Sequence, residues 1–76
     1  MTIKMLAKRL IEDDEELKNV DCWEVISLHS RLFKIFTNRK ELHDFLLEYA
    51  EFGWKLDKIE KKKDAPDNTS LVWLKI

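Results

Sequence analysis

The side chains able to act as nucleophiles or metal ligands are few in this sequence: Cys22, His29 and His43. Zinc sites usually draw their ligands in closely spaced pairs, and these three residues show no such spacing. Cys22 and a histidine could form a nucleophile and its base, but a lone cysteine at the start of a strand is usually a small buried hydrophobic residue. The single glycine in the chain cannot build a glycine-rich phosphate loop. We therefore expect no enzyme activity, no metal site and no cofactor.

A cluster of lysines in the C-terminal half points to a different chemistry, the binding of nucleic acid. The cluster consists of Lys55, Lys58, Lys61, Lys62 and Lys63. Together with tryptophans on the same sheet, it would suit a surface that holds single-stranded nucleic acid by its phosphates and bases. Lysines on an edge strand also guard it against pairing with another chain. Because 14 basic and 15 acidic residues give a net charge of −1, nucleic-acid binding is only the alternative hypothesis.

Five consecutive acidic residues form a third feature with functional potential. They are Glu12, Asp13, Asp14, Glu15 and Glu16. Such a run is usually a solvated face, but it would also suit a basic protein partner. Acids late in a helix oppose the helix dipole. Either a helix predicted over residues 2–18 breaks near Ile11 and restarts, or the acids are tolerated there because water surrounds them.

A central helix between Asn38 and Gly53 is predicted from its capping residues and its apolar spacing. Asn38 can cap the first turn, and Glu41 completes a capping box. Gly53 supplies the left-handed conformation that ends a helix. The apolar residues that share one face are Leu42, Phe45, Leu46, Tyr49 and Phe52.

Four segments rich in β-branched and aromatic residues predict strands over 21–28, 31–37, 54–62 and 71–76. Residues 29–30 are either a hairpin turn or a kink in one long extended segment. The last two strands are expected to pair as an antiparallel hairpin. Ile59 is out of phase with Trp54 and Leu56, which a β-bulge or a frayed strand end would explain.

Together these elements predict an α+β fold in the order α-β-β-α-β-β. We expect a small antiparallel sheet of three to four strands, packed by the central helix, within a single domain spanning residues 1–76. The last strand is apolar on both faces, as is the segment 31–37, so the second face of the sheet needs a cover. The candidates for this cover are the N-terminal helix and a second copy of the protein.

Four short segments of residues 22–76 form a distinctive pattern: Trp23-Glu24-Val25-Ile26, then Leu42, Leu46-Leu47 and Tyr49 in the helix, Gly53-Trp54-Lys55-Leu56 after it, and the apolar strand Leu71–Ile76. In this pattern residues 22–76 resemble the domain of unknown function 4177 family of small bacterial and phage proteins. The resemblance implies a strand–helix–hairpin fold for residues 21–76 and assigns no activity. The segment 1–20 has no counterpart in this pattern and looks like an addition, which either carries the specific function or covers the second face of the sheet.

We therefore expect a small non-catalytic regulatory or accessory protein that binds itself and another protein. The candidate interface combines sheet aromatics with the acidic run at 12–16, and its aromatic members are Trp23, Phe33, Phe36 and Trp73. The single cysteine excludes an internal disulfide and favours the cytoplasm. No apolar run approaches the roughly 20 residues that cross a bilayer, so no membrane partner is expected.

Overall fold

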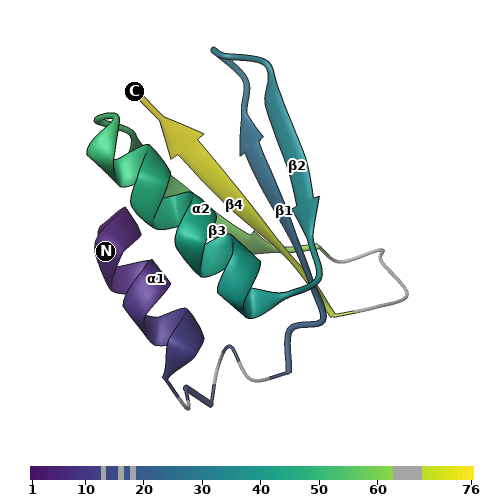
Figure 1. Ribbon diagram of the computed structural model, residues 1–76. Helices are drawn as coiled ribbons and strands as arrows, with labels where there is room; N and C mark the ends of the chain where they lie inside the picture. Colours follow the sequence, from purple (N-terminus) through teal and green to yellow (C-terminus); the bar gives the residue numbers. More distant parts are fainter. Residues whose placement is uncertain (13, 16, 18, 63–67) are drawn as a thin grey trace.

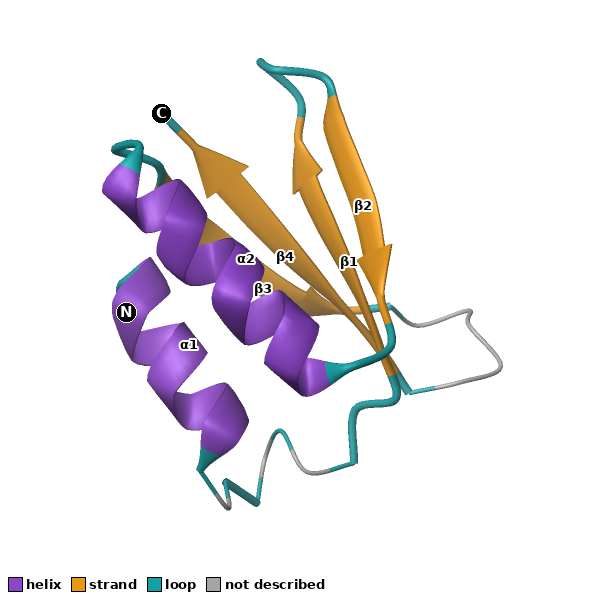
Figure 2. Ribbon diagram, in the orientation of Figure 1, coloured by secondary structure: helices purple, strands orange, loops and turns teal. Residues whose placement is uncertain are grey.

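Two helices and four strands make up the described part of the chain, in the predicted order α-β-β-α-β-β (Figure 1, Figure 2). The structure is a computed structural model and describes residues 1–12, 14–15, 17, 19–62 and 68–76. The elements are α1 (Ile3–Ile11), β1 (Cys22–Ser27), β2 (Leu32–Phe36), α2 (Arg39–Glu51), β3 (Lys55–Lys61) and β4 (Thr69–Lys75). The predicted α+β class is confirmed.

The sheet is mixed, with the strand order β2-β1-β4-β3. β1 pairs antiparallel with β2, and β3 pairs antiparallel with β4, but β1 and β4 lie parallel to each other in the centre. The expectation of a purely antiparallel sheet is therefore wrong for this central pair. The physical reason is the connection through α2, which takes the chain from one edge strand, β2, to the opposite edge strand, β3. The second hairpin consequently docks with β4 beside β1.

Both hairpins form where local sequence predicted them. Ser27 pairs with Leu32, so the segment 28–31 is a hairpin turn rather than a kink. In the second hairpin, the register shifts between Leu56 and Lys58. This shift is the β-bulge that the phase of Ile59 predicted, and it lets residues on both sides of the bulge keep their apolar side chains toward the core.

α2 begins and ends at the predicted capping residues. The Asn38 side-chain oxygen accepts hydrogen bonds from the backbone N–H groups of Lys40 and Glu41, at 2.8 and 3.2 Å. Gly53 has a φ of 91°, in the left-handed region, and its N–H donates to the carbonyl of Ala50 at 3.1 Å. These bonds satisfy backbone groups that a helix end would otherwise leave unpaired.

The apolar face of α2 is shorter than its sequence pattern predicted. Leu42, Phe45 and Leu46 are buried and Tyr49 is half-buried, but Phe52 is 68% exposed. The assignment of Phe52 to the buried face is therefore wrong. Phe52 follows the last helical residue and has a ψ of 1°, so the chain leaves the helix before the periodicity can turn this side chain inward.

Replacing Asn38 by alanine is expected to lower the free energy of unfolding by about 1 kcal/mol. The substitution removes the oxygen that accepts from two N–H groups in the first turn of α2. Urea unfolding followed by far-ultraviolet circular dichroism measures the loss. Asn38→Asp keeps an acceptor and is the control, so an equal loss in both variants would contradict the capping role.

α1 is shorter than the predicted helix and ends at Ile11, at the break that the acidic run suggested. The Thr2 hydroxyl caps its first turn by accepting from the N–H of Met5 at 3.1 Å. Beyond the helix, the Arg9 guanidinium donates from Nε to the Asp14 carboxylate at 2.7 Å. The described acids Glu12, Asp14 and Glu15 therefore follow the helix instead of extending it, and Glu12 and Asp14 contact the cations of its last turn, Lys8 and Arg9.

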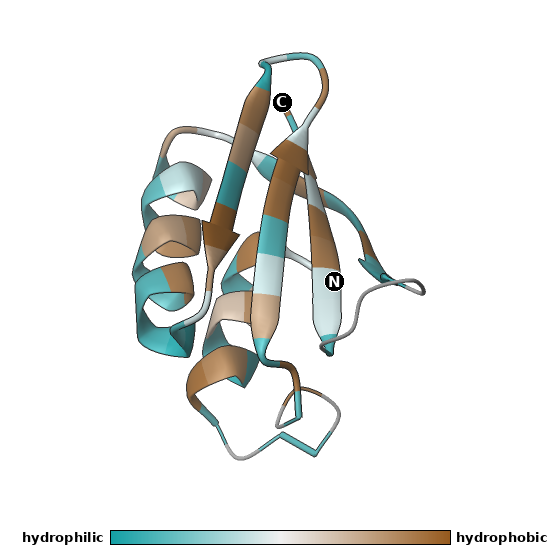
Figure 3. Cartoon of the chain, turned by 90° about the vertical axis from the view of Figure 1, so that its right-hand side faces the viewer, coloured by the Kyte–Doolittle hydropathy of each residue, from teal (hydrophilic) through white to brown (hydrophobic). Residues whose placement is uncertain are grey.

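A single hydrophobic core joins the two helices to one face of the sheet (Figure 1, Figure 3). Its members from α1 are Ile3, Leu6, Ala7 and Leu10, all between 0 and 3% exposed. Because α1 packs beside α2 on the same side, α1 does not cover the second face of the sheet. Neither helix in the described part of the chain is long and apolar enough to cross a membrane.

Candidate protein-binding face

The face of the sheet that points away from α1 and α2 is the candidate site, and we call it the open face (Figure 3). Strand pairing aligns two rows of side chains across it. The first row is Phe33, Ile26, Trp73 and Lys58, and the second row is Ile35, Glu24, Leu71 and Glu60. The first row runs from apolar residues at the β2 edge to Lys58 at the β3 edge, and the second row alternates apolar residues with Glu24 and Glu60.

The apolar part of the open face consists of Ile26, Phe33, Ile35, Leu71 and Trp73, and we call it the open-face patch. Phe33 and Ile35 are 58% and 56% exposed, and the other three are half-buried. Scattered exposed apolar residues are ordinary, but a contiguous group on one face usually marks an interaction surface. The geometry of the patch therefore suits contact with another protein.

Ion pairs cover the remainder of the open face. The Lys58 ammonium lies 2.6 Å from the Glu60 carboxylate and 5.3 Å from the centroid of the Trp73 ring. The hydrogen bond that the Lys58 ammonium donates to the Glu60 carboxylate raises the pKa of Lys58 above its ordinary value. The Lys62 ammonium lies 3.0 Å from the largely buried carboxylate of Glu24. These lysines place their apolar stems on the sheet and their charges on acidic partners, as long cationic side chains commonly do.

The register separates one described member of the lysine cluster proposed for nucleic-acid binding from the others. Lys58 and Lys62 contact carboxylates on the open face. Lys61 pairs with Ser70 in the row that faces the helices, so it leaves the strand on the opposite side. Lys55 pairs with Lys75, two residues beyond Trp73, so it lies on the side of the open face, and Lys63 lies outside the described residues. The alternation of side chains along the strand therefore separates Lys61 from the other described lysines of the cluster.

Two of the four candidate interface aromatics, Phe33 and Trp73, lie on the open face. Trp23 and Phe36 are 1% and 8% exposed and face the helices, so their assignment to the interface is wrong. The physical reason is the register, which pairs Trp23 with Phe36 in an inward row. There the Phe36 ring packs against Phe45, with 5.0 Å between the ring centroids.

The acidic run contributes little continuous acidic surface in the described part of the chain. Glu12 and Glu15 are exposed, while the Asp14 carboxylate is bonded to Arg9. The Glu12 carboxylate also lies 3.8 Å from the ammonium of Lys8. Asp13 and Glu16, the other two members of the predicted interface, lie outside the described residues.

The three side chains considered for catalysis lie on different elements of the structure. Cys22 is half-buried at the start of β1, and His29 is exposed in the first hairpin turn. His43 lies on α2, where its Nδ1 is 2.9 Å from an Asp44 carboxylate oxygen. The hydrogen bond with His43 is the largest cause of a pKa lowering at Asp44, and Lys40 adds to it. Among the described residues, no three potential metal ligands gather into a site.

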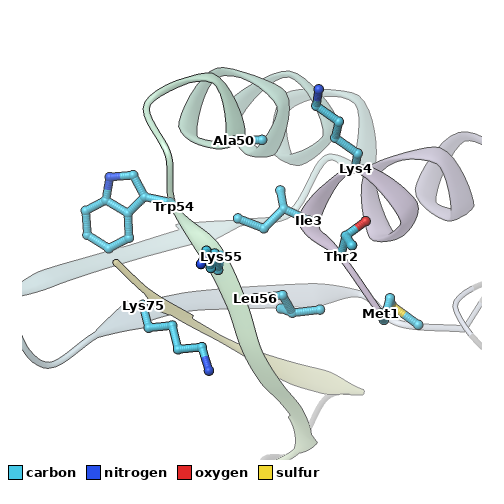
Figure 4. A pocket seen from close by; sticks show the side chains of 9 residues that line it. All are labelled: Met1, Thr2, Ile3, Lys4, Ala50, Trp54, Lys55, Leu56 and Lys75. Atoms are coloured by element: carbon cyan, nitrogen blue, oxygen red, sulfur yellow. The ribbon is translucent and has the colours of Figure 1, made fainter.

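A hollow of about 510 Å³ lies where the start of α1, the end of α2 and the start of β3 meet (Figure 4). Ile3 and Leu56 point toward the same space, and Trp54 lies to one side of it. Its lining includes Lys4, Lys55 and Lys75, and the Lys4 ammonium lies 3.8 Å from the Glu51 carboxylate. Among the described residues that line the hollow, none carries a carboxylate, thiol or imidazole side chain.

Comparisons with known proteins assign neither a family nor a function. No protein-family model, no curated protein and no solved structure matches this chain. The functional argument therefore depends on the geometry of the open face.

Proposed function

We propose that this protein is a small non-catalytic regulatory or accessory module that binds proteins, itself included, through the open-face patch. The observation that supports this most strongly is the row formed by Phe33, Ile26 and Trp73 on a sheet face that no described helix covers. Aromatic and aliphatic side chains of this kind form the dehydrated centre of protein interfaces, and a few of them provide most of the binding free energy.

The charged border of the patch also favours a protein partner over a nucleic acid. Lys58 and Glu60 lie beside the patch, and Lys62 contacts Glu24 between Ile35 and Leu71, so each cation is matched by a carboxylate. A mixed, partly solvated border is typical of the rim of a protein interface. A surface for nucleic acid would instead present unmatched cations along the path of the phosphates.

The proposal extends to the cellular setting and to the family. A single cysteine is compatible with a reducing cytoplasm, where we place the protein. The succession of β1, β2, α2, β3 and β4 is compatible with the strand–helix–hairpin fold that the resemblance to the domain of unknown function 4177 family implies. Membership of that family is accordingly part of the proposal.

Replacing Phe33 by serine is expected to weaken self-association at least about tenfold, as loss of an interface hot spot does. The matched control is Phe52→Ser, which removes a similarly exposed phenylalanine from the end of α2, away from the open face. Multi-angle light scattering over a range of protein concentrations measures the equilibrium. A tagged pull-down from host lysate, with and without nuclease, tests for another protein partner with the same two variants.

Binding that is lost with Phe33→Ser and kept with Phe52→Ser would support the open-face patch as the interface. Equal behaviour of the two variants would contradict it. A captured species that disappears after nuclease treatment would favour the nucleic-acid alternative. If the wild-type chain is monomeric at every concentration and captures no protein, the proposed function is wrong.

A further inference from the structure

The two edges of the sheet differ in their protection against pairing with another strand. The β3 edge contains a bulge and five charged residues, Lys55, Asp57, Lys58, Glu60 and Lys61. Bulges and charges of this kind prevent edge-to-edge pairing in natural sheets. β2, at the other edge, has the sequence Leu-Phe-Lys-Ile-Phe and pairs with β1 in an unbroken register from Leu32 to Phe36. β2 therefore has no bulge and a single charge, Lys34, against the five charges of β3.

Lys34, the single charge on β2, is held on the side of the sheet that faces the helices. It pairs with Val25, a buried core residue. Its ammonium lies 5.8 Å from the centroid of the Phe36 ring and 5.4 Å from that of Phe45. These cation–π contacts draw the charge over rings of its own chain. The side of β2 on the open face therefore presents only Phe33 and Ile35.

We propose that β2 pairs antiparallel with β2 of a second copy and joins the two four-stranded sheets into one continuous sheet. The proposal rests on the self-association in the proposed function and names its geometry. A strand added to a free edge gains a ladder of backbone hydrogen bonds. Pairing of β2 with itself about a two-fold axis uses the same surface on both copies, as closed symmetric dimers do.

The charge of Lys34 selects the register of this pairing. An axis through Lys34 would set two ammonium groups directly opposite each other, which is unfavourable in an antiparallel pair. An axis through Phe33 or Ile35 avoids this and places that residue beside its own copy on the open face. Either choice brings the two open-face patches together into one apolar surface across the new pair of strands.

Stacking of two open faces on each other is a less favourable way to form the dimer. It would bring the pairs Lys58–Glu60 and Lys62–Glu24 into the interface and remove water from four charges on each copy. Edge pairing through β2 leaves the Lys58–Glu60 pair at the opposite edge of each sheet, in contact with water, and keeps the Lys62–Glu24 pair outside the new pair of strands. It also shields Phe33 and Ile35, the two most exposed residues of the patch.

Disulfide cross-linking tests this geometry, because residues opposite each other in an antiparallel pair have Cα atoms about 4.5–5.5 Å apart, within disulfide range. Single cysteines replace Phe33, Ile35 and Lys58 in a Cys22→Ser background. After mild oxidation, we expect F33C or I35C to give a predominant cross-linked dimer on a non-reducing gel. K58C, on the opposite edge, is expected to stay monomeric. Circular dichroism of the reduced variants verifies that each is folded.

The other outcomes separate this geometry from the proposed function. A wild-type dimer whose F33C and I35C variants do not cross-link would overturn edge pairing and leave self-association standing. Equal cross-linking of K58C would also overturn it. A monomeric wild-type chain that captures another protein through Phe33 would overturn edge pairing and support the proposed function.

Discussion

Replacement of Leu6 by alanine is expected to lower the free energy of unfolding by about 2–5 kcal/mol. Leu6 is 0% exposed and belongs to the core that α1 shares with α2 and the sheet. The substitution removes buried methyl groups and leaves a cavity that a close-packed core fills only in part. Since small domains have a total stability of about 5–15 kcal/mol, this loss would unfold a substantial fraction of the protein at moderate denaturant concentration.

The control for this prediction is the neighbouring residue Met5, which is 55% exposed. Met5→Ala is expected to change the free energy of unfolding by no more than about 0.5 kcal/mol. Chemical denaturation of both variants, followed by circular dichroism and by tryptophan fluorescence, gives the comparison. Similar midpoints for the two variants would show that α1 is not part of the cooperative core and would contradict the structure.

Replacement of Trp23 by alanine is expected to lower the free energy of unfolding by about 3–5 kcal/mol. The side chain is 1% exposed and is the largest of the fully buried residues. It lies on β1 opposite Phe36 of β2 and beside Ser70 of β4, so its loss affects both hairpins. We expect the variant to be partly unfolded at room temperature, as measured by the loss of near-ultraviolet circular dichroism.

A second substitution at the same position, Trp23→Phe, distinguishes the contribution of the aromatic ring to stability from that of the indole N–H group. The indole nitrogen of Trp23 is buried and has no hydrogen-bond partner in the part of the chain that the structure describes. An unsatisfied buried donor costs about 1–3 kcal/mol, and phenylalanine removes this cost while keeping an aromatic ring. Trp23→Phe is therefore expected to be much more stable than Trp23→Ala. Equal losses would show that the N–H group has an essential partner.

Features that depend on neighbouring residues could be predicted from the sequence. Asn38 and Gly53 identified the ends of α2 because each supplies a specific backbone bond or conformation. The phase of Ile59 against Leu56 indicated the bulge in β3, since side chains on a strand alternate strictly. The acidic run indicated that α1 could end near Ile11, because the helix dipole disfavours acids in the last turn of a helix.

Features that depend on distant pairing could not be predicted in this way. Nothing local to β1 or β4 indicates that they lie parallel, because that pairing joins segments on opposite sides of α2 in the sequence. The alternation in β2 separates Phe33 and Ile35 from Leu32 and Phe36, but both sets are apolar. Which set faces the helices is therefore decided only by the register with β1.

The same limit explains the partial success at the open face. Phe33 and Trp73 were identified as aromatic candidates, whereas Ile26, Ile35 and Leu71 were missed. Their alternation in phase with Phe33 and Trp73 was the available signal. This alternation predicts a common surface only when the strand order is known, because the three missed residues lie on three different strands.

The parallel pairing of β1 with β4 also has a consequence for the order of folding. Each hairpin and α2 can form from nearby residues, but the centre of the sheet forms only when Cys22 meets Thr69. Contacts between residues so distant in sequence slow folding, because a long loop must close before they contribute. During synthesis, β1 is made well before β4, and it waits with an unpaired edge of apolar character. Newly made chains are therefore most prone to aggregation in the interval before β4 is complete.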